Sequence, residues 1–139
     1  MEPELAELDA AVKQTEVRLR KLVATAIDNR IEQIPSHVMQ TMKERIATAV
    51  RKDPMLEHEL EEQVAAKLDY LDLRHLEDTI CSKVLWPLFE QRFGTKEQLH
   101  ARFGHLAELR NGLSHSRAVT QVTQKDGEAA ILWFERTLA

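Results

Sequence analysis

Apolar side chains recur at steps of three and four residues along most of this chain, and no other feature constrains the fold as strongly. The N-terminal stripe consists of Leu5, Leu8, Val12, Thr15, Leu19, Leu22 and Ala26. It predicts a helix over residues 4–33 that buries one face, either on its own domain or on a second chain. Four glycines and 5% aromatic residues argue against a β-sandwich or a barrel. The chain is therefore predicted to be all-α.

Prolines and capping residues mark where the later helices begin. Pro35 closes the first helix, and Ser36 is a candidate N-cap for the second. Asp53-Pro54 then restarts the chain, because a capping carboxylate followed by proline is typical of a first helical turn. We therefore divide the chain into an N-terminal helical extension over residues 1–53 and a helical bundle over residues 54–139.

Local signals also divide the predicted bundle. Pro87 predicts a kink or a new first turn, and Gly94 predicts the C-terminal cap of the same helix. Residues 95–98, with the sequence Thr-Lys-Glu-Gln, match a capping box and open the next helix. The helical period then disappears over residues 116–125, which predicts a loop, and Asp126 is the expected cap of a final helix.

The hexapeptide Arg110-Asn111-Gly112-Leu113-Ser114-His115 combines an arginine, an amide and a histidine near the end of a predicted helix. On a regular helix Arg110 and His115 lie about 140° apart, so they share one face only if the helix bends or ends between them. Gly112 makes such a departure cheap. Arg110 also falls in an apolar stripe, where its permanent charge needs an anion, a hydrogen-bonded partner or a wet groove between subunits. The stripe consists of Leu99, Phe103, Leu106, Arg110 and Leu113.

This hexapeptide resembles the R-x-x-x-x-H signature of HEPN domains, which are small all-helical modules of prokaryotic toxins, phage-defence systems and RNA-processing proteins. The wider resemblance covers roughly residues 54–139. It is greatest to the HEPN branch found at the C-terminus of a eukaryotic nuclear mRNA-surveillance endoribonuclease and in many bacterial relatives. The segments that carry it are residues 71–80, Trp86-Pro87-Leu88-Phe89, Phe93-Gly94, residues 106–111 and Trp133-Phe134. The resemblance implies an up-and-down four-helix bundle with additional N-terminal helices, and two motifs that face each other across a homodimer interface.

The side chains of the motif suit RNA cleavage by attack of the ribose 2′-hydroxyl. Histidine titrates near neutral pH, so His115 is the expected general acid or base, while Arg110 would stabilise the charge on the phosphorane. Asn111 could orient the phosphate or the imidazole. This chemistry requires no metal and no cofactor. It would leave 2′,3′-cyclic phosphate ends on the RNA.

Positive charge is concentrated around the motif, although the whole chain has a formal net charge of -4. Residues 96–125 contain five basic side chains against two acidic ones. Such a local excess favours an anion-binding groove, and chance variation along helical surfaces explains it equally well. Under the first interpretation the expected RNA contacts are Arg102, His105, Arg117 and Lys125.

A purely structural role for the same residues is the alternative. Arg110 could pair inside the bundle with Asp69, Asp72 or Glu77, and His115 could be a helix-terminal residue favoured by the helix dipole. Asp72 and His75 lie one turn apart, as in di-iron bundles, but the chain lacks the second such pair that a metal site of this kind needs. No metal site is predicted.

Composition bounds the compartment and the class of partner. The chain has one cysteine, no run of about 18 apolar residues and no basic N-terminal start, so we expect a cytoplasmic protein without a membrane partner. Two functions stay open. One is a homodimeric, metal-independent endoribonuclease in prokaryotic defence or RNA turnover, with an antitoxin or a larger defence-system protein as a further partner. The other is a noncatalytic helical adaptor that dimerises and binds RNA or a protein.

Overall fold

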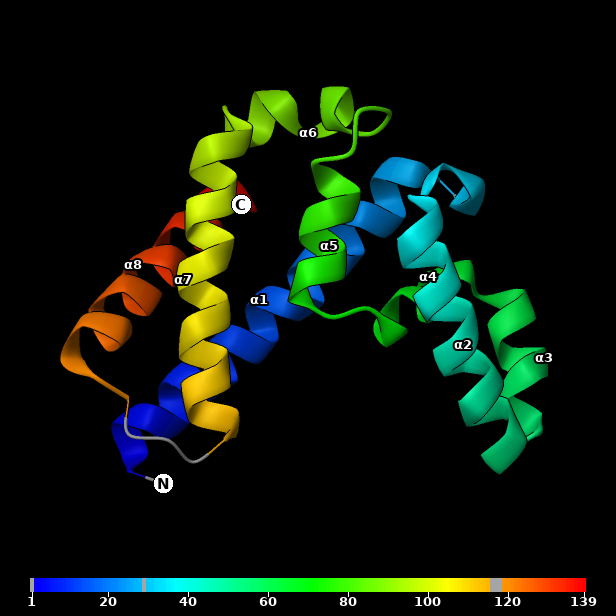
Figure 1. The fold of residues 1–139 in the computed structure, drawn as a ribbon, viewed down its shortest axis with the longest axis horizontal. Coiled ribbons are helices and arrows are strands. Elements are labelled where there is room, and N and C mark those ends of the chain that lie inside the picture. Colours follow the sequence, from blue (N-terminus) through cyan, green and yellow to red (C-terminus); the bar gives the residue numbers. More distant parts are fainter. Residues whose placement is uncertain (1, 29, 116–118) are drawn as a thin grey trace. The chain divides into compact units, whose positions relative to one another are not determined.

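The computed structural model describes residues 2–28, 30–115 and 119–139. These residues form α-helices joined by short turns, with no strand among them, so the predicted all-α class is confirmed (Figure 1). The helices are α1 (Pro3–Ile27), α2 (Ser36–Lys52), α3 (Met55–Glu62), α4 (Val64–Lys67), α5 (Leu73–Ile80), α6 (Trp86–Phe93), α7 (Lys96–Ser114) and α8 (Gln121–Thr137). Two 3-10 helices, η1 (Ile31–Gln33) and η2 (Leu68–Tyr70), complete the order.

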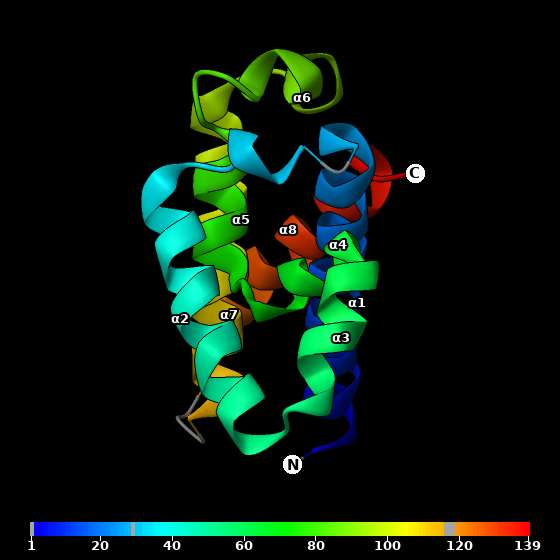
Figure 2. The same cartoon turned by 90° about the vertical axis from the view of Figure 1, so that its right-hand side faces the viewer.

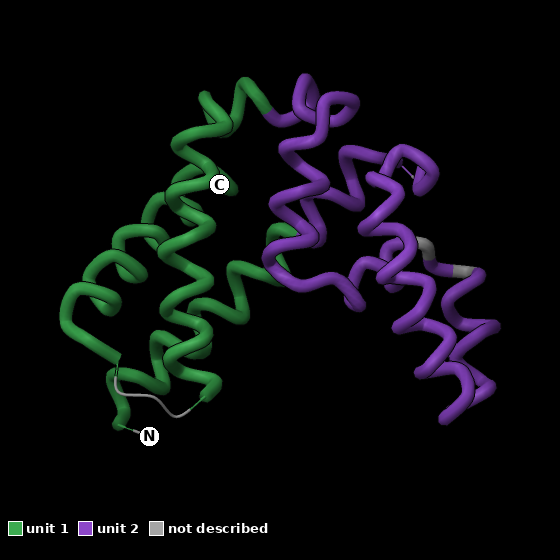
Figure 3. Tube along the Cα trace, viewed as in Figure 1, with its two compact units in different colours: residues 1–19, 90–139 green, residues 20–89 purple. Residues whose placement is uncertain are grey.

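The chain forms two compact units, of which the first comprises residues 1–19 and 90–139 (Figure 3). In this unit α7 and α8 lie side by side and run in opposite directions, and the first part of α1 packs with them (Figure 1). The aromatic rings of Phe103 and Phe134 meet edge to face between α7 and α8, with 5.2 Å between their centroids. Other buried residues of this core are Val12, Leu99, Leu106, Leu109 and Ala130.

The second unit comprises residues 20–89. Helices α2 and α3 run in opposite directions and are joined by a tight turn (Figure 2). Arg20 and Arg45 hold the turn before α5 by donating hydrogen bonds to the carbonyl oxygens of Leu71 and Tyr70, at 2.7 and 2.8 Å. The buried core of this unit includes Val23, Ile27, Val38, Met42, Leu76 and Ile80.

The compact units do not follow the division at residue 54 that the capping signals suggest. Helix α1 contributes to both units, because its buried residues continue from Val12 through Leu19 and Val23 to Ile27 without a break. Of the predicted stripe, Val12, Thr15 and Leu19 are buried within their own chain.

Several predicted helix boundaries are confirmed. Helix α6 begins at Trp86, so Pro87 occupies a first turn as expected. Gly94 follows this helix with a φ of +87°, the left-handed conformation that favours glycine at a helix C-terminus. The Thr95 hydroxyl then accepts a hydrogen bond from the Gln98 backbone N–H at 3.1 Å and caps α7.

Three predicted boundaries are wrong. Helix α1 ends at Ile27 rather than at residue 33, because the chain turns at Asp28, whose φ is +46°, and continues into η1. Ser36 is the first residue of α2 and makes no cap, since Pro35 holds the N-cap position. Helix α8 starts at Gln121, capped by the Thr120 hydroxyl, and Asp126 lies inside it rather than before it.

Candidate functional site

Helix α7 carries the motif and buries one face in its unit. Its buried side chains are Leu99, Phe103, Leu106, Leu109 and Leu113. All of these except Leu109 belong to the predicted stripe. Arg110 lies beside this stripe and is half-exposed, whereas Asn111 is exposed. Leu109, rather than Arg110, is therefore the buried residue in this turn of the helix.

Arg110 pairs with Glu16 of α1. Its Nε atom lies 2.6 Å from a carboxylate oxygen of Glu16. The Glu16 side chain is only 7% exposed, while that of Arg110 is 41% exposed. A buried carboxylate therefore holds the inner edge of a guanidinium whose outer part reaches the surface.

The observed partner of Arg110 is Glu16, and not one of the three acids that the sequence offers, Asp69, Asp72 and Glu77. A sequence signal for Glu16 does exist. It lies four residues after Val12 and three before Leu19, so it shares the helical face that these buried residues define. An acid inside an apolar stripe indicates a buried charge that needs a cation, and Arg110 is a cation inside another such stripe.

His115 is exposed and lies at the C-terminal end of α7, where its backbone N–H donates to the Asn111 carbonyl at 3.1 Å. The helix continues through Gly112 to Ser114, and His115 is its C-cap residue. The two side chains therefore stay about 140° apart around the helix axis. Within the described part of the chain, the His115 side chain makes no ion pair or hydrogen bond.

Gly112 has a packing role instead of the predicted hinge role. A Cβ atom at this position would lie 3.2 Å from the Cγ2 atom of Val119, a close contact for which the neighbour must shift. Its small size thus lets Val119 approach α7.

The remaining predicted RNA contacts are divided between different surfaces. Arg102 lies over the ring of Trp133 on α8, with 5.8 Å to the ring centroid. His105 also faces α8, where its Nε2 atom lies 3.9 Å from Asp126. Lys125 is exposed on α8, and Arg117 lies outside the described residues. Since Arg110 faces α1, the described basic residues of this region do not share one face of α7.

Asp72 and His75, considered as half of a metal site, form a helix cap. The Asp72 carboxylate accepts a hydrogen bond from the His75 backbone N–H at 3.2 Å, and His75 Nδ1 accepts one from the Asp72 N–H at 3.3 Å. Burial raises the pKa of Asp72, but the bond from the His75 N–H and the charges of His75 and Arg45 outweigh burial and lower that pKa below its usual value. In the described ranges no group of three or more His, Cys, Asp or Glu side chains could hold a metal ion.

Comparison of the chain with protein-family models, with curated proteins and with solved structures found no match. No described helix is long and apolar enough to cross a membrane. Any assignment of function therefore depends on the motif and on the geometry around Arg110.

Proposed function

We propose that this protein is a HEPN-type endoribonuclease whose site is completed by two chains, each supplying Arg110, Asn111 and His115. The observation that carries this proposal is the ion pair between Arg110 Nε and the buried carboxylate of Glu16. It occupies one edge of the guanidinium. The contact with Glu16 is through Nε, and the two terminal amino groups are the groups that can bind two oxygens of a phosphate.

A second chain is needed because of the helix geometry. Arg110 lies within α7 and His115 is its C-cap residue, five positions later and about 140° around the helix axis, so we infer that a single chain does not aim both at one phosphodiester. His115 is exposed at the helix end and Arg110 is half-exposed, so each is accessible to a second copy. Pairing Arg110 of one chain with the histidine of another gives two equivalent sites in a two-fold dimer.

The chemistry assigns each side chain one task. The ribose 2′-oxygen attacks the adjacent phosphorus, loses its proton to a base, and the bond to the 5′-oxygen breaks as that oxygen gains a proton. His115 would carry out one of these proton transfers, while Arg110 stabilises the negative charge on the phosphorane. The products are a 2′,3′-cyclic phosphate and a free 5′-hydroxyl. Neither a metal nor a cofactor takes part in these steps.

The test is cleavage of RNA by the purified chain in excess EDTA. We expect cyclic phosphate ends on the products. His115→Ala and Arg110→Ala should each lower the rate about a hundredfold or more, the usual scale for losing a general acid–base or a charge stabiliser. His100→Ala, which removes another exposed histidine of α7, is the matched control and should keep the wild-type rate.

The second candidate function is a noncatalytic adaptor that dimerises and binds RNA or a protein through the same residues. It is favoured by the surroundings of His115, which has no carboxylate partner among the described residues to orient its imidazole. Two results together would favour the adaptor over the enzyme. The wild-type chain would bind RNA and leave it intact, and Arg110→Ala would lose this binding.

A further inference from the structure

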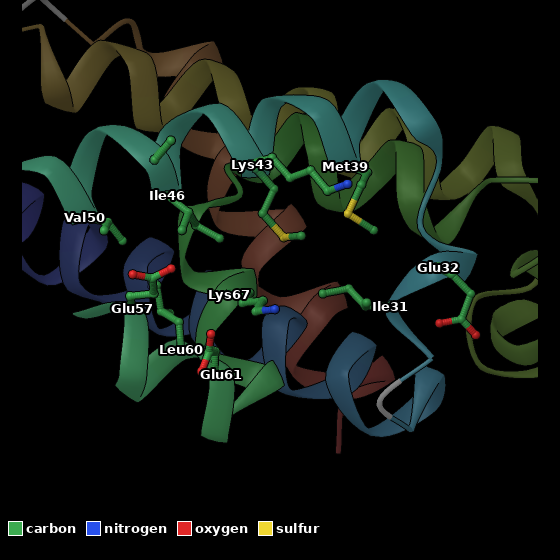
Figure 4. A pocket seen from close by; sticks show the side chains of 12 residues that line it. Ile31, Glu32, Met39, Lys43, Ile46, Val50, Glu57, Leu60, Glu61 and Lys67 are labelled. Atoms are coloured by element: carbon green, nitrogen blue, oxygen red, sulfur yellow. The ribbon is translucent and has the colours of Figure 1, made fainter. Parts of the chain in front are cut away.

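The unit formed by residues 20–89 contains an open groove of about 640 Å³ along one face of α2 (Figure 4). Its apolar floor consists of Ile31, Met39, Met42, Ile46, Val50 and Leu60. Met42 and Leu60 are buried, but the other four remain partly exposed. The groove follows α2 from Met39 to Val50, which is about 16 Å at 1.5 Å per residue.

Acidic side chains surround this floor. Glu32, Glu57 and Glu61 are exposed at the groove and outnumber its two lysines, Lys43 and Lys67 (Figure 4). None of the three carboxylates makes an ion pair or hydrogen bond with another described residue. A shallow apolar groove with unpaired acids suits an amphipathic helix that presents apolar and basic side chains on one face.

The chain itself has such a face, on α8. The stripe consists of Val122, Lys125, Ala129, Leu132 and Arg136, at steps of three and four residues. All five are exposed, and the large apolar members are strongly so, Val122 at 70% and Leu132 at 61%. The stripe contains two basic residues and no acidic one, and it extends over about 21 Å of helix.

We propose that the groove on α2 binds the α8 stripe of a second copy of this chain. Val122 and Leu132 would cover the apolar floor, and Lys125 and Arg136 would meet the glutamates of the groove. Val122 and Leu132 lie about 15 Å apart along α8, which is close to the length of the groove, and the charges of the stripe and of the groove are opposite. The proposal does not depend on RNA cleavage, because it involves neither Arg110 nor His115, and it shares only Lys125 with the expected RNA contacts.

Charge reversal tests the contact from both sides. The variant Glu57→Lys with Glu61→Lys makes the groove basic, and the variant Lys125→Glu with Arg136→Glu makes the stripe acidic. Each should raise the dissociation constant for self-association about tenfold or more, measured by sedimentation at micromolar concentrations. An equimolar mixture of the two variants should regain association, because every groove then finds a stripe of opposite charge.

Lys21→Glu with Lys83→Glu is the matched control, since both are exposed lysines outside the groove and the stripe. It should associate as the wild type does. All these substitutions are at exposed positions, and circular dichroism checks that helicity is kept. A wild-type chain that stays monomeric overturns the proposal. So does a pair of reversed variants that associate as well as the wild type, or a mixture that stays dissociated.

Discussion

Glu16 of α1 and Arg110 of α7 form an ion pair that joins the N-terminal helix to the helix carrying the R-x-x-x-x-H motif. The acid is buried and the base reaches the surface, so the pair links the packing of the two helices to a guanidinium at the surface. The same contact thus bears on stability and on the proposed site.

Removing the guanidinium should destabilise the fold. Arg110→Ala leaves the buried Glu16 carboxylate without this cation, and we expect the free energy of unfolding to fall by about 2–4 kcal/mol, which is near the lower end for a broken buried pair because Arg110 is partly solvated. Urea unfolding measures this. Arg102→Ala is the control and should cost only about 0.5–1 kcal/mol, the scale of an exposed cation–π contact. Equal losses for the two variants would contradict a special role for the Glu16 pair.

The approach of α7 to α8 depends on Gly127. A Cβ atom there would lie 2.5 Å from Leu109 Cδ2 and 2.8 Å from Leu109 Cβ, so the helices must move apart to accept it. We expect Gly127→Ala to lower the melting temperature, with a cost of about 1–3 kcal/mol. Gly104→Ala is the matched control on α7, because beyond the adjoining backbone of its own helix nothing lies within 4 Å of its added Cβ. It should stabilise by up to about 1 kcal/mol through helix propensity, and a Gly127→Ala variant as stable as this control would refute the close contact.

Asp72 should make the fold sensitive to acid. The pKa of its carboxyl is lowered in the folded state, so the native state binds fewer protons than the unfolded one around this pKa. The stabilisation that Asp72 contributes is therefore complete at a pH above the pKa of its carboxyl in the unfolded chain, about 3.9. It is lost as the pH falls through the lower pKa of the folded state. In urea unfolding across this pH range, Asp72→Asn should show a weaker loss of stability on acidification than the wild type. Asp69→Asn, which removes an exposed neighbouring carboxylate, should keep the wild-type slope.

Complementation tests whether the proposed RNA site is shared between chains. In a mixed dimer of Arg110→Ala and His115→Ala subunits, one of the two sites keeps both an arginine and a histidine if they come from different chains. A mixture of the inactive variants should then regain part of the cleavage rate. If both side chains act from the same chain, mixing restores no activity. The measurement is the cleavage rate before and after subunit exchange.

Local features of this fold could be predicted from the sequence, whereas contacts between distant segments could not. The all-α class, the start of α6 at Trp86 and the cap of α7 at Thr95 follow from periodicity and from residues adjacent in the chain. The start of α8 was missed because Thr120 and Asp126 both have capping side chains, and only the tertiary structure selects the first. The partner of Arg110 was missed for a related reason, since Glu16 lies on a helix that the motif does not adjoin in sequence.

The discontinuous composition of the first unit has a consequence for biosynthesis. Residues 20–89 form a unit from one uninterrupted stretch, whereas residues 1–19 belong with residues 90–139. On the ribosome the chain emerges from its N-terminus, so the middle unit can fold while the C-terminal helices are still being made. The first turns of α1 must wait for α7 and α8, and the pair between Glu16 and Arg110 closes only after α7 has been made. Nascent chains stopped before α7 would therefore have the apolar residues of early α1, such as Val12, still open to chaperones or to a neighbouring nascent chain.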